Sequence, residues 1–106
     1  MSYRFELSGH ENSITKLEVV RHGDGYMLAS SSKDGYIRLW RITPNLEVIK
    51  FHKNVKAIGQ LYCFLDAVLI SHESSVTGLK WVRFNGELQL ISCSLDCTIC
   101  VWGAEK

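Results

Sequence analysis

The sequence predicts an all-β fold in which one unit of antiparallel strands occurs twice. Residues 10–40 align with residues 72–102 at an offset of 62 without a gap, and 13 of the 31 paired positions are identical. In both copies, apolar and polar residues alternate with the period of two that a strand with one buried face requires. Turns separate these stretches, and all but the one at residues 95–97 contain glycine or asparagine. No segment has a convincing helical periodicity.

The first copy predicts three strands in succession. Leu17 and Val19 alternate with polar neighbours in the first strand, and the glycine-rich turn 23–25 leads into the second. A tight turn at 33–35 leads into the third strand, which ends near Trp40. The expected strands are residues 15–19, 26–31 and 36–42.

The second copy repeats this order. Asn85-Gly86 is the hairpin turn, and residues 95–97 form the second tight turn. An apolar, strand-like stretch also precedes each histidine, at residues 3–7 and 64–70. The other expected strands of this copy are residues 77–81, 87–93 and 98–102.

Composition and charge exclude several classes of protein. Hydrophobic residues make up 46% and charged residues 22% of the 106 positions, a globular balance rather than a disordered one. The net charge of +1 provides no overall field that would attract nucleic acid or an anionic membrane. The longest apolar run, residues 61–70, contains Asp66 and is too short to span a bilayer. The N-terminus lacks the apolar core of a signal peptide, so we expect an intracellular protein with four reduced cysteines.

Two histidine-to-tryptophan stretches resemble the WD40 repeat. His10 is followed after 24 residues by Asp34 and after 6 more by Trp40. The second copy keeps both spacings with His72, Asp96 and Trp102. It departs from the family by Ser71 where glycine is usual, and Arg41 and Gly103 replace the aspartate that normally follows each tryptophan.

The resemblance implies two four-stranded antiparallel blades of a WD40 β-propeller. A period of 62 exceeds the usual repeat of about 40–45 residues, which indicates an insertion between the blades. The expected divisions are a first blade at 1–42, an inter-blade insertion at 43–60 and a second blade at 61–106. Two blades cannot close a propeller, so the missing blades come from the rest of a longer chain or from self-association; the sequence favours a fragment.

In WD40 repeats, the equivalent residues form a hydrogen-bonded structural relay. The resemblance assigns this role to His10, Ser30, Asp34 and Trp40, and to His72, Ser92, Asp96 and Trp102. Serine, histidine and aspartate are also the residue types of a hydrolase triad. Their recurrence at the same spacing in both copies favours a repeated structural device, and no catalytic residue is expected.

Cys93, Cys97 and Cys100 have the C-x3-C-x2-C spacing that radical SAM enzymes use for an iron–sulfur cluster. Such a cluster requires a flexible loop, whereas these residues run from a strand through a tight turn into another strand. The chain is also too small for the barrel of those enzymes. A zinc site that adds Cys63 or a histidine is disfavoured because no C-x-x-C pair occurs. The sequence therefore predicts no cofactor and no metal.

Five residues are candidates for contact with a partner. Tyr26 and Tyr36 border turns on the faces where WD40 proteins often bind partners. Lys50, Lys53 and Lys56 lie in the insertion, where basic residues greatly outnumber acidic ones. A solvated loop explains this charge, and the alternative is contact with RNA phosphates or an acidic protein surface. Val48, Ile49, Val55 and Ile58 are expected to tuck the insertion against a blade.

The long insertion and the paired His-Glu loops resemble more closely the double-propeller WD40 subunits of the Elongator complex. This resemblance implies a non-catalytic scaffold that contacts other protein subunits and supports modification of wobble uridines in tRNA, with indirect tRNA association at most. It further implies a location in the cytoplasm, with the nucleus as a second compartment, and no membrane association. The alternative is a WD40 adaptor in another assembly, such as a ubiquitin-ligase substrate receptor.

Overall fold

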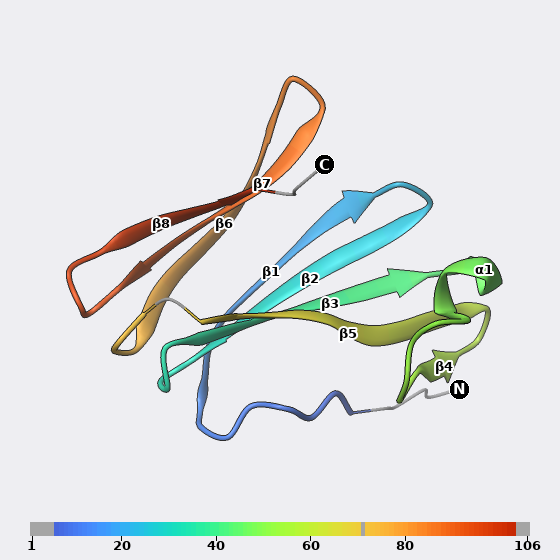
Figure 1. Ribbon diagram of the computed structural model, residues 1–106, viewed down its shortest axis with the longest axis horizontal. Coiled ribbons are helices and arrows are strands. Elements are labelled where there is room, and N and C mark those ends of the chain that lie inside the picture. Colours follow the sequence, from blue (N-terminus) through green and yellow to red (C-terminus); the bar gives the residue numbers. More distant parts are fainter. Residues whose placement is uncertain (1–5, 71, 104–106) are drawn as a thin grey trace.

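The computed structural model of the chain describes residues 6–70 and 72–103. Its strands form two antiparallel sheets, which confirms the all-β prediction (Figure 1). The first sheet has the order β1-β2-β3-β5-β4 and the second has the order β6-β7-β8. The strands of the first sheet are β1 (Ile14–His22), β2 (Gly25–Ser32), β3 (Tyr36–Thr43), β4 (Lys56–Ile58) and β5 (Leu61–Ile70). Those of the second are β6 (Val76–Phe84), β7 (Glu87–Ser94) and β8 (Ile99–Gly103).

The sequence repeat is also a structural repeat. In both copies the register of the first strand pair shifts at a threonine, between Ile14 and Lys16 and between Val76 and Gly78. Each copy then forms a two-residue hairpin turn. Asn85 and Gly86 both have positive φ, at 50° and 78°, as a hairpin with the right-handed twist of its strands requires. The bulge therefore occurs in both copies, whereas the two-residue turns differ, because in the first turn Gly23 has a positive φ of 60° and Asp24 does not have a positive φ.

The strand that precedes the second histidine differs from the expected division of the chain. β5 pairs with β3 from Tyr36↔Ile70 to Thr43↔Tyr62, so it belongs to the first sheet. The free edge of β3 needs backbone partners, and the returning chain supplies them in the antiparallel direction. The insertion at 43–60 thus lies inside the first blade, between its third and fourth strands. Among the described residues the sheets have five and three strands, and the predicted strand at 3–7 lies largely outside that part.

The insertion contains two short elements that the sequence did not predict. The helix α1 spans Leu46–Ile49, and Asn45 caps it by accepting a hydrogen bond from the backbone N–H of Glu47 at 2.9 Å. The strand β4 then pairs with β5 at the edge of the first sheet. A four-residue helix shows no periodicity, which explains why the pattern missed it. In the described part of the chain, no helix has the length and apolar character needed to cross a membrane.

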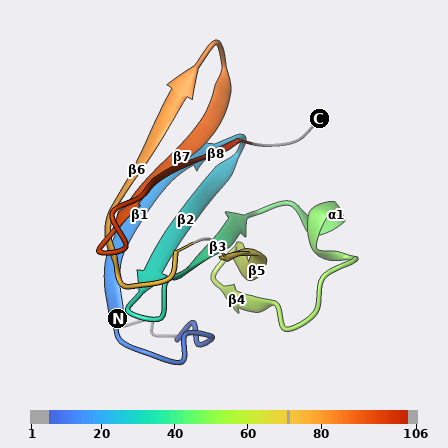
Figure 2. The same cartoon turned by 60° about the vertical axis from the view of Figure 1, so that its left-hand side comes forward.

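The core lies between the two sheets. Ala29 and Ile37 of the first sheet pack with Val76 and Leu90 of the second, and all four are buried. β1 and β6 contact one another and lie side by side in both views (Figures 1 and 2). The indole N–H of Trp81 also donates to the backbone oxygen of Glu18 across this contact, at 3.0 Å. The two sheets therefore pack as neighbouring blades.

A glycine in the first blade permits a second close approach between the sheets. Gly35 has φ +86°, and a Cβ added there would lie 2.2 Å from the backbone oxygen of His72. The turn between β2 and β3 therefore meets the backbone of the loop that opens the second copy. Only glycine provides both the positive φ and the space.

Candidate functional site

The predicted relay of the first copy forms around a buried serine. The Oγ atom of Ser30 lies 2.6 Å from Nε2 of His10 and accepts a hydrogen bond from the indole N–H of Trp40 at 2.9 Å. The guanidinium of Arg38 lies 2.7 Å from Nδ1 of His10. Asp34 instead accepts the backbone N–H of Tyr36 at 2.9 Å, and no hydrogen bond joins it to His10. The structure thus brings three of the four predicted residues together and adds Arg38.

The contact with Arg38 fixes the protonation of His10. A guanidinium can only donate hydrogen bonds, so Nδ1 of His10 must be an acceptor and the proton must reside on Nε2. His10 therefore donates to Ser30. Burial and the positive charge of Arg38 hold the pKa of His10 below its ordinary value, while Asp34 acts in the opposite direction.

The second relay is complete. Nδ1 of His72 lies 3.3 Å from the carboxylate of Asp96 and 3.0 Å from the hydroxyl of Thr98. Its Nε2 lies 2.8 Å from Oγ of Ser92, which accepts the indole N–H of Trp102 at 3.2 Å. Nδ1 therefore faces a carboxylate and donates to it, opposite to the role of Nδ1 in His10.

Several hydrogen bonds meet at the carboxylate of Asp96 in the second copy. A hydrogen bond from the Thr98 hydroxyl holds its pKa well below the usual range, and backbone N–H groups of Glu73 and Thr98 and the ring of His72 act in the same direction. Burial opposes this shift. The carboxylate thus remains charged, and its hydrogen bonds connect the loop before β6 to the turn after β7.

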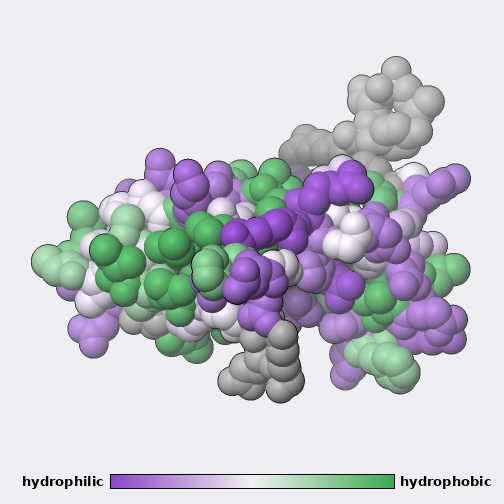
Figure 3. All heavy atoms as spheres, turned by 90° about the horizontal axis from the view of Figure 1, so that it is seen from above, coloured by the Kyte–Doolittle hydropathy of each residue, from purple (hydrophilic) through white to green (hydrophobic). Residues whose placement is uncertain are grey.

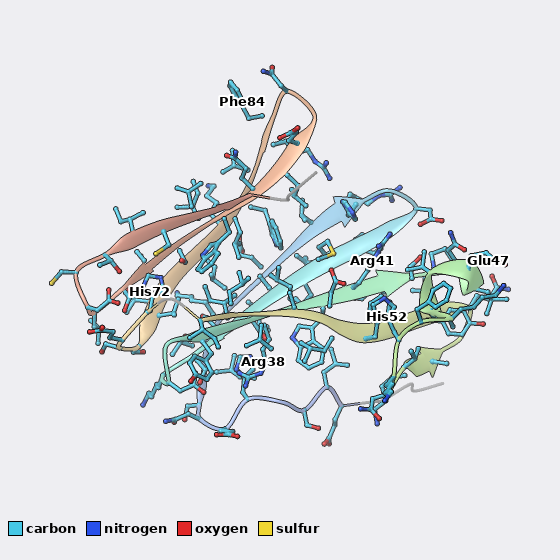
Figure 4. All side chains as sticks on the ribbon, in the orientation of Figure 1. Arg38, Arg41, Glu47, His52, His72 and Phe84 are labelled. Carbon is cyan, nitrogen blue, oxygen red and sulfur yellow. The ribbon has the colours of Figure 1, made fainter. Side chains whose placement is uncertain are left out.

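Two substitutions between the copies explain the difference in the relays. Thr98 occupies the place of Tyr36, and Cys100 occupies the place of Arg38. The Thr98 hydroxyl hydrogen-bonds to both His72 and Asp96, and the Arg38 guanidinium reaches His10 from β3. Figure 4 shows Arg38 between β3 and the segment that precedes β1. The aligned copies contain this signal, but WD40 resemblance alone directs attention to the shared residues and misses Arg38.

The cysteines do not converge. Cys97 is exposed in the tight turn with φ 71°, while Cys93 and Cys100 are half-buried on neighbouring strands. Cys63 lies in the other sheet, where burial raises its pKa to about 11. Among residues 6–70 and 72–103, no group of three or more histidine, cysteine or acidic side chains could hold a metal ion.

The predicted contact residues lie in different settings. Tyr26 is partly exposed with the guanidinium of Arg21 over its ring at 5.5 Å, and Tyr36 is half-buried with Arg38 at 5.8 Å from its ring. In the insertion, Lys50 is paired with Glu47 at 2.8 Å, so its charge is matched. The other two candidates, Lys53 and Lys56, are exposed and have no ion pair in the described part of the chain.

Two clefts each include the tryptophan of one relay in their lining. The first, of about 270 Å³, lies between the sheets and is lined mainly by apolar side chains that include Trp81 and Trp102. The second, of about 480 Å³, lies between the insertion and the first sheet. Trp40 and Phe64 contribute to its floor, and Lys53 and Lys56 to its rim. The second cleft is thus bordered by two of the three predicted basic residues.

Comparison with known families agrees with this architecture. The family described as "WD domain, G-beta repeat" matches residues 1–41 and 64–103, which together form most of the chain. The chain therefore belongs to the WD40 repeat family. The residues between the two matches are those of the insertion and the beginning of β5.

Alignments with curated relatives span nearly the whole chain, including the insertion. "Elongator complex protein 2" of Drosophila melanogaster is 31% identical over 121 residues, which cover 93% of this chain and 15% of the relative. The proteins of the same name from Saccharomyces cerevisiae and Danio rerio are 32% and 30% identical, over 95% and 94% of this chain. They are covered to 15% and 14% of their own lengths. The chain thus spans about 15% of the length of the relatives that it matches.

Proposed function

We propose that this chain is part of a non-catalytic WD40 scaffold that assembles with the protein subunits of an Elongator complex. One observation carries the proposal. The two family matches leave out the insertion, whereas the alignment with the Drosophila relative covers 93% of the chain and therefore runs through it. An alignment confined to the repeats would point only to the WD40 family, whereas one that spans both repeats and the insertion, at 31% identity over 121 residues, favours this particular subunit.

The burial of both relays supports a structural rather than a catalytic role. Ser30 is 2% exposed and Ser92 is 1% exposed, so neither hydroxyl can be reached by a substrate. Each serine oxygen is also engaged by a histidine and a tryptophan. A hydrolase needs an accessible nucleophile and a site for the developing oxyanion. The relays instead connect each histidine loop to the second and third strands of its copy, β2 and β3 or β7 and β8, and we assign them to fold stability.

The open faces of the two sheets support incorporation into a larger propeller. Leu17 and Val19 of β1 are 59% and 61% exposed on one side, and Ile99 and Val101 of β8 are 73% and 61% exposed on the other. Figure 3 shows hydrophobic side chains gathered over the end of the molecule formed by the second sheet. Further blades would cover both faces and complete the rigid platform on which scaffold subunits bind partners.

In this role the protein would support modification of wobble uridines in tRNA without contacting the reacting base. Its net charge of +1 favours contact with protein subunits over direct binding of tRNA. The proposed location is the cytoplasm, with the nucleus as a second compartment.

Affinity purification of the tagged, intact protein from cell extract tests the proposal. We expect Elongator subunits to be recovered in stoichiometric amounts, and loss of the protein to lower wobble-uridine modification in total tRNA. The variant Ser30→Ala serves as a control for a catalytic role. It should lower the stability of the protein, and no catalytic activity should be lost with it. Recovery of a cullin-based ligase without any Elongator subunit would overturn the proposal and favour a ubiquitin-ligase adaptor.

A further inference from the structure

The insertion is an anchored part of the first sheet. We call residues 44–60 the insertion platform. Its strand β4 pairs with β5 at Lys56↔Cys63 and Ala57↔Tyr62, and the ring of His52 stacks on that of Phe64 at 3.9 Å. Val48, Ile49 and Val55 are half-buried, as the sequence predicted for a segment that tucks against a blade. The platform therefore holds its surface residues in place, which lowers the entropy that a partner must overcome on binding.

Of the three lysines on the platform, one forms an ion pair with a described residue and two do not. Lys50 and Glu47 neutralise one another at the end of α1, three residues apart in sequence. Lys53 and Lys56 lie beyond this pair and make no ion pair with any described residue. Figure 4 shows Glu47 and His52 over the same end of the first sheet. The platform therefore presents two unmatched positive charges, even though the net charge of the whole chain is small.

These lysines border a cleft with a mixed polar and apolar lining. The cleft, of about 480 Å³, is lined by Trp40, Phe64 and Leu65 of the sheet, by Lys53, Asn54 and Lys56 of the platform, and by residues 7–8 before β1. Phe64 is 1% exposed and Trp40 is 6% exposed, whereas Leu65 is 40% exposed and can contact a partner. Phe51, two residues before Lys53 in the sequence, is 90% exposed and offers a further apolar surface. Apolar surface beside two unmatched cations fits a partner that carries both apolar and acidic side chains.

We propose that this cleft binds an acidic peptide segment of a partner protein, which places an apolar side chain against Leu65 and aspartate or glutamate side chains against Lys53 and Lys56. Charge complementarity selects an acidic partner, because the described residues that line the cleft include these two lysines and no acidic side chain. A protein fits better than RNA. Two unmatched lysines neutralise few phosphates, and the Phe64 ring face that could stack on a base is occupied by His52.

This inference names the partner chemistry for one surface of the proposed scaffold and rests on that scaffold role. The test measures binding of fluorescent ten-residue peptides, composed of aspartate, glutamate, serine and one leucine, to the intact protein. The double variant Lys53→Glu/Lys56→Glu should lower affinity at least tenfold. The matched control Lys33→Glu/Lys80→Glu changes the same charge at exposed positions away from the cleft and should leave affinity within about twofold. Raised salt should weaken binding to the unsubstituted protein.

Two further measurements keep the outcomes distinct. Phe51→Ala, a surface change that leaves the charges intact, should lower affinity for peptides containing leucine more than for peptides without it. Equal losses in both double variants, or tighter binding of a single-stranded uridine-rich RNA than of the acidic peptides, would overturn the inference. Peptide binding that persists when no Elongator subunit co-purifies would leave the cleft assignment intact and overturn the proposed complex. Co-purification without peptide binding would do the reverse.

Discussion

The two copies of the repeat have the same strands but opposite surroundings. Ile37 on β3 is fully buried against the second sheet, whereas its counterpart Ile99 on β8 is 73% exposed. On the other side, Leu79 of β6 packs against the core, whereas its counterpart Leu17 on β1 is 59% exposed. The sequence alternation is the same in each pair. Burial therefore depends on whether a neighbouring blade is present and not on the repeat itself, as expected for a repeat architecture.

The largest expected effect on stability is the difference between alanine substitutions of these two isoleucines. Ile37→Ala removes a fully buried side chain and should lower the free energy of unfolding by about 2–5 kcal/mol. Ile99→Ala removes an exposed one and should change it by less than about 0.5 kcal/mol. Urea unfolding followed by circular dichroism measures both. A comparable loss for Ile99→Ala would mean that the outer face of the second sheet is covered in solution, by another blade or another copy.

The next effect concerns the contact between the turn of the first blade and the loop of the second. Gly35→Ala introduces a Cβ that would lie 2.2 Å from the backbone oxygen of His72, at φ +86°. Gly86→Ala is the matched control, because φ there is +78° and no atom lies within 4 Å of the added Cβ.

The control should cost about 1–2 kcal/mol, from backbone strain alone. Gly35→Ala should cost more, by about 1–3 kcal/mol, because the loop before β6 must also shift. Thermal melting of both variants at the same pH provides the comparison. Equal losses would show that the two blades do not approach one another at this turn.

Much of the fold could be predicted because it is encoded in local patterns that occur twice. Alternation, the Asn85-Gly86 turn and the spacing from histidine to tryptophan each specify local geometry, and the structure has strands and hairpin turns where they were expected. Membership of β5 in the first sheet could not be predicted in the same way. An apolar strand is equally suited to either sheet, and its partner is chosen by the long-range pairing with β3.

The candidate site was predictable only in part for the same physical reason. Both serines and both histidines join their tryptophans as the family pattern indicates, since their spacing along the strands fixes which side chains meet. Arg38 was missed because reaching His10 depends on a long flexible side chain crossing from β3 to a loop. The pairing of Lys50 with Glu47, three residues apart on α1, likewise required knowledge of a helix too short to show in the pattern.

The smallest expected effect is that the two relays lose their contributions to stability in different pH ranges. His10 is held neutral, with its pKa below the ordinary 6.5, so the unfolded chain binds a proton more readily than the folded one. Its contribution to stability is therefore fully present above about pH 6.5 and decreases as the pH falls through that value toward the lower folded pKa. Asp96 has its pKa below the ordinary 3.8, so its contribution is lost only as the pH falls below about 4.

The urea midpoint should therefore fall modestly between about pH 7 and pH 5 through the first copy, with a separate fall below about pH 4 through the second. His10→Gln should flatten the first interval and leave the second. Asp96→Asn should do the opposite, which makes each variant the control of the other. If His10→Gln retained the full decrease between about pH 7 and pH 5, the decrease would not come from His10, and burial and Arg38 would not be lowering the pKa of that imidazole.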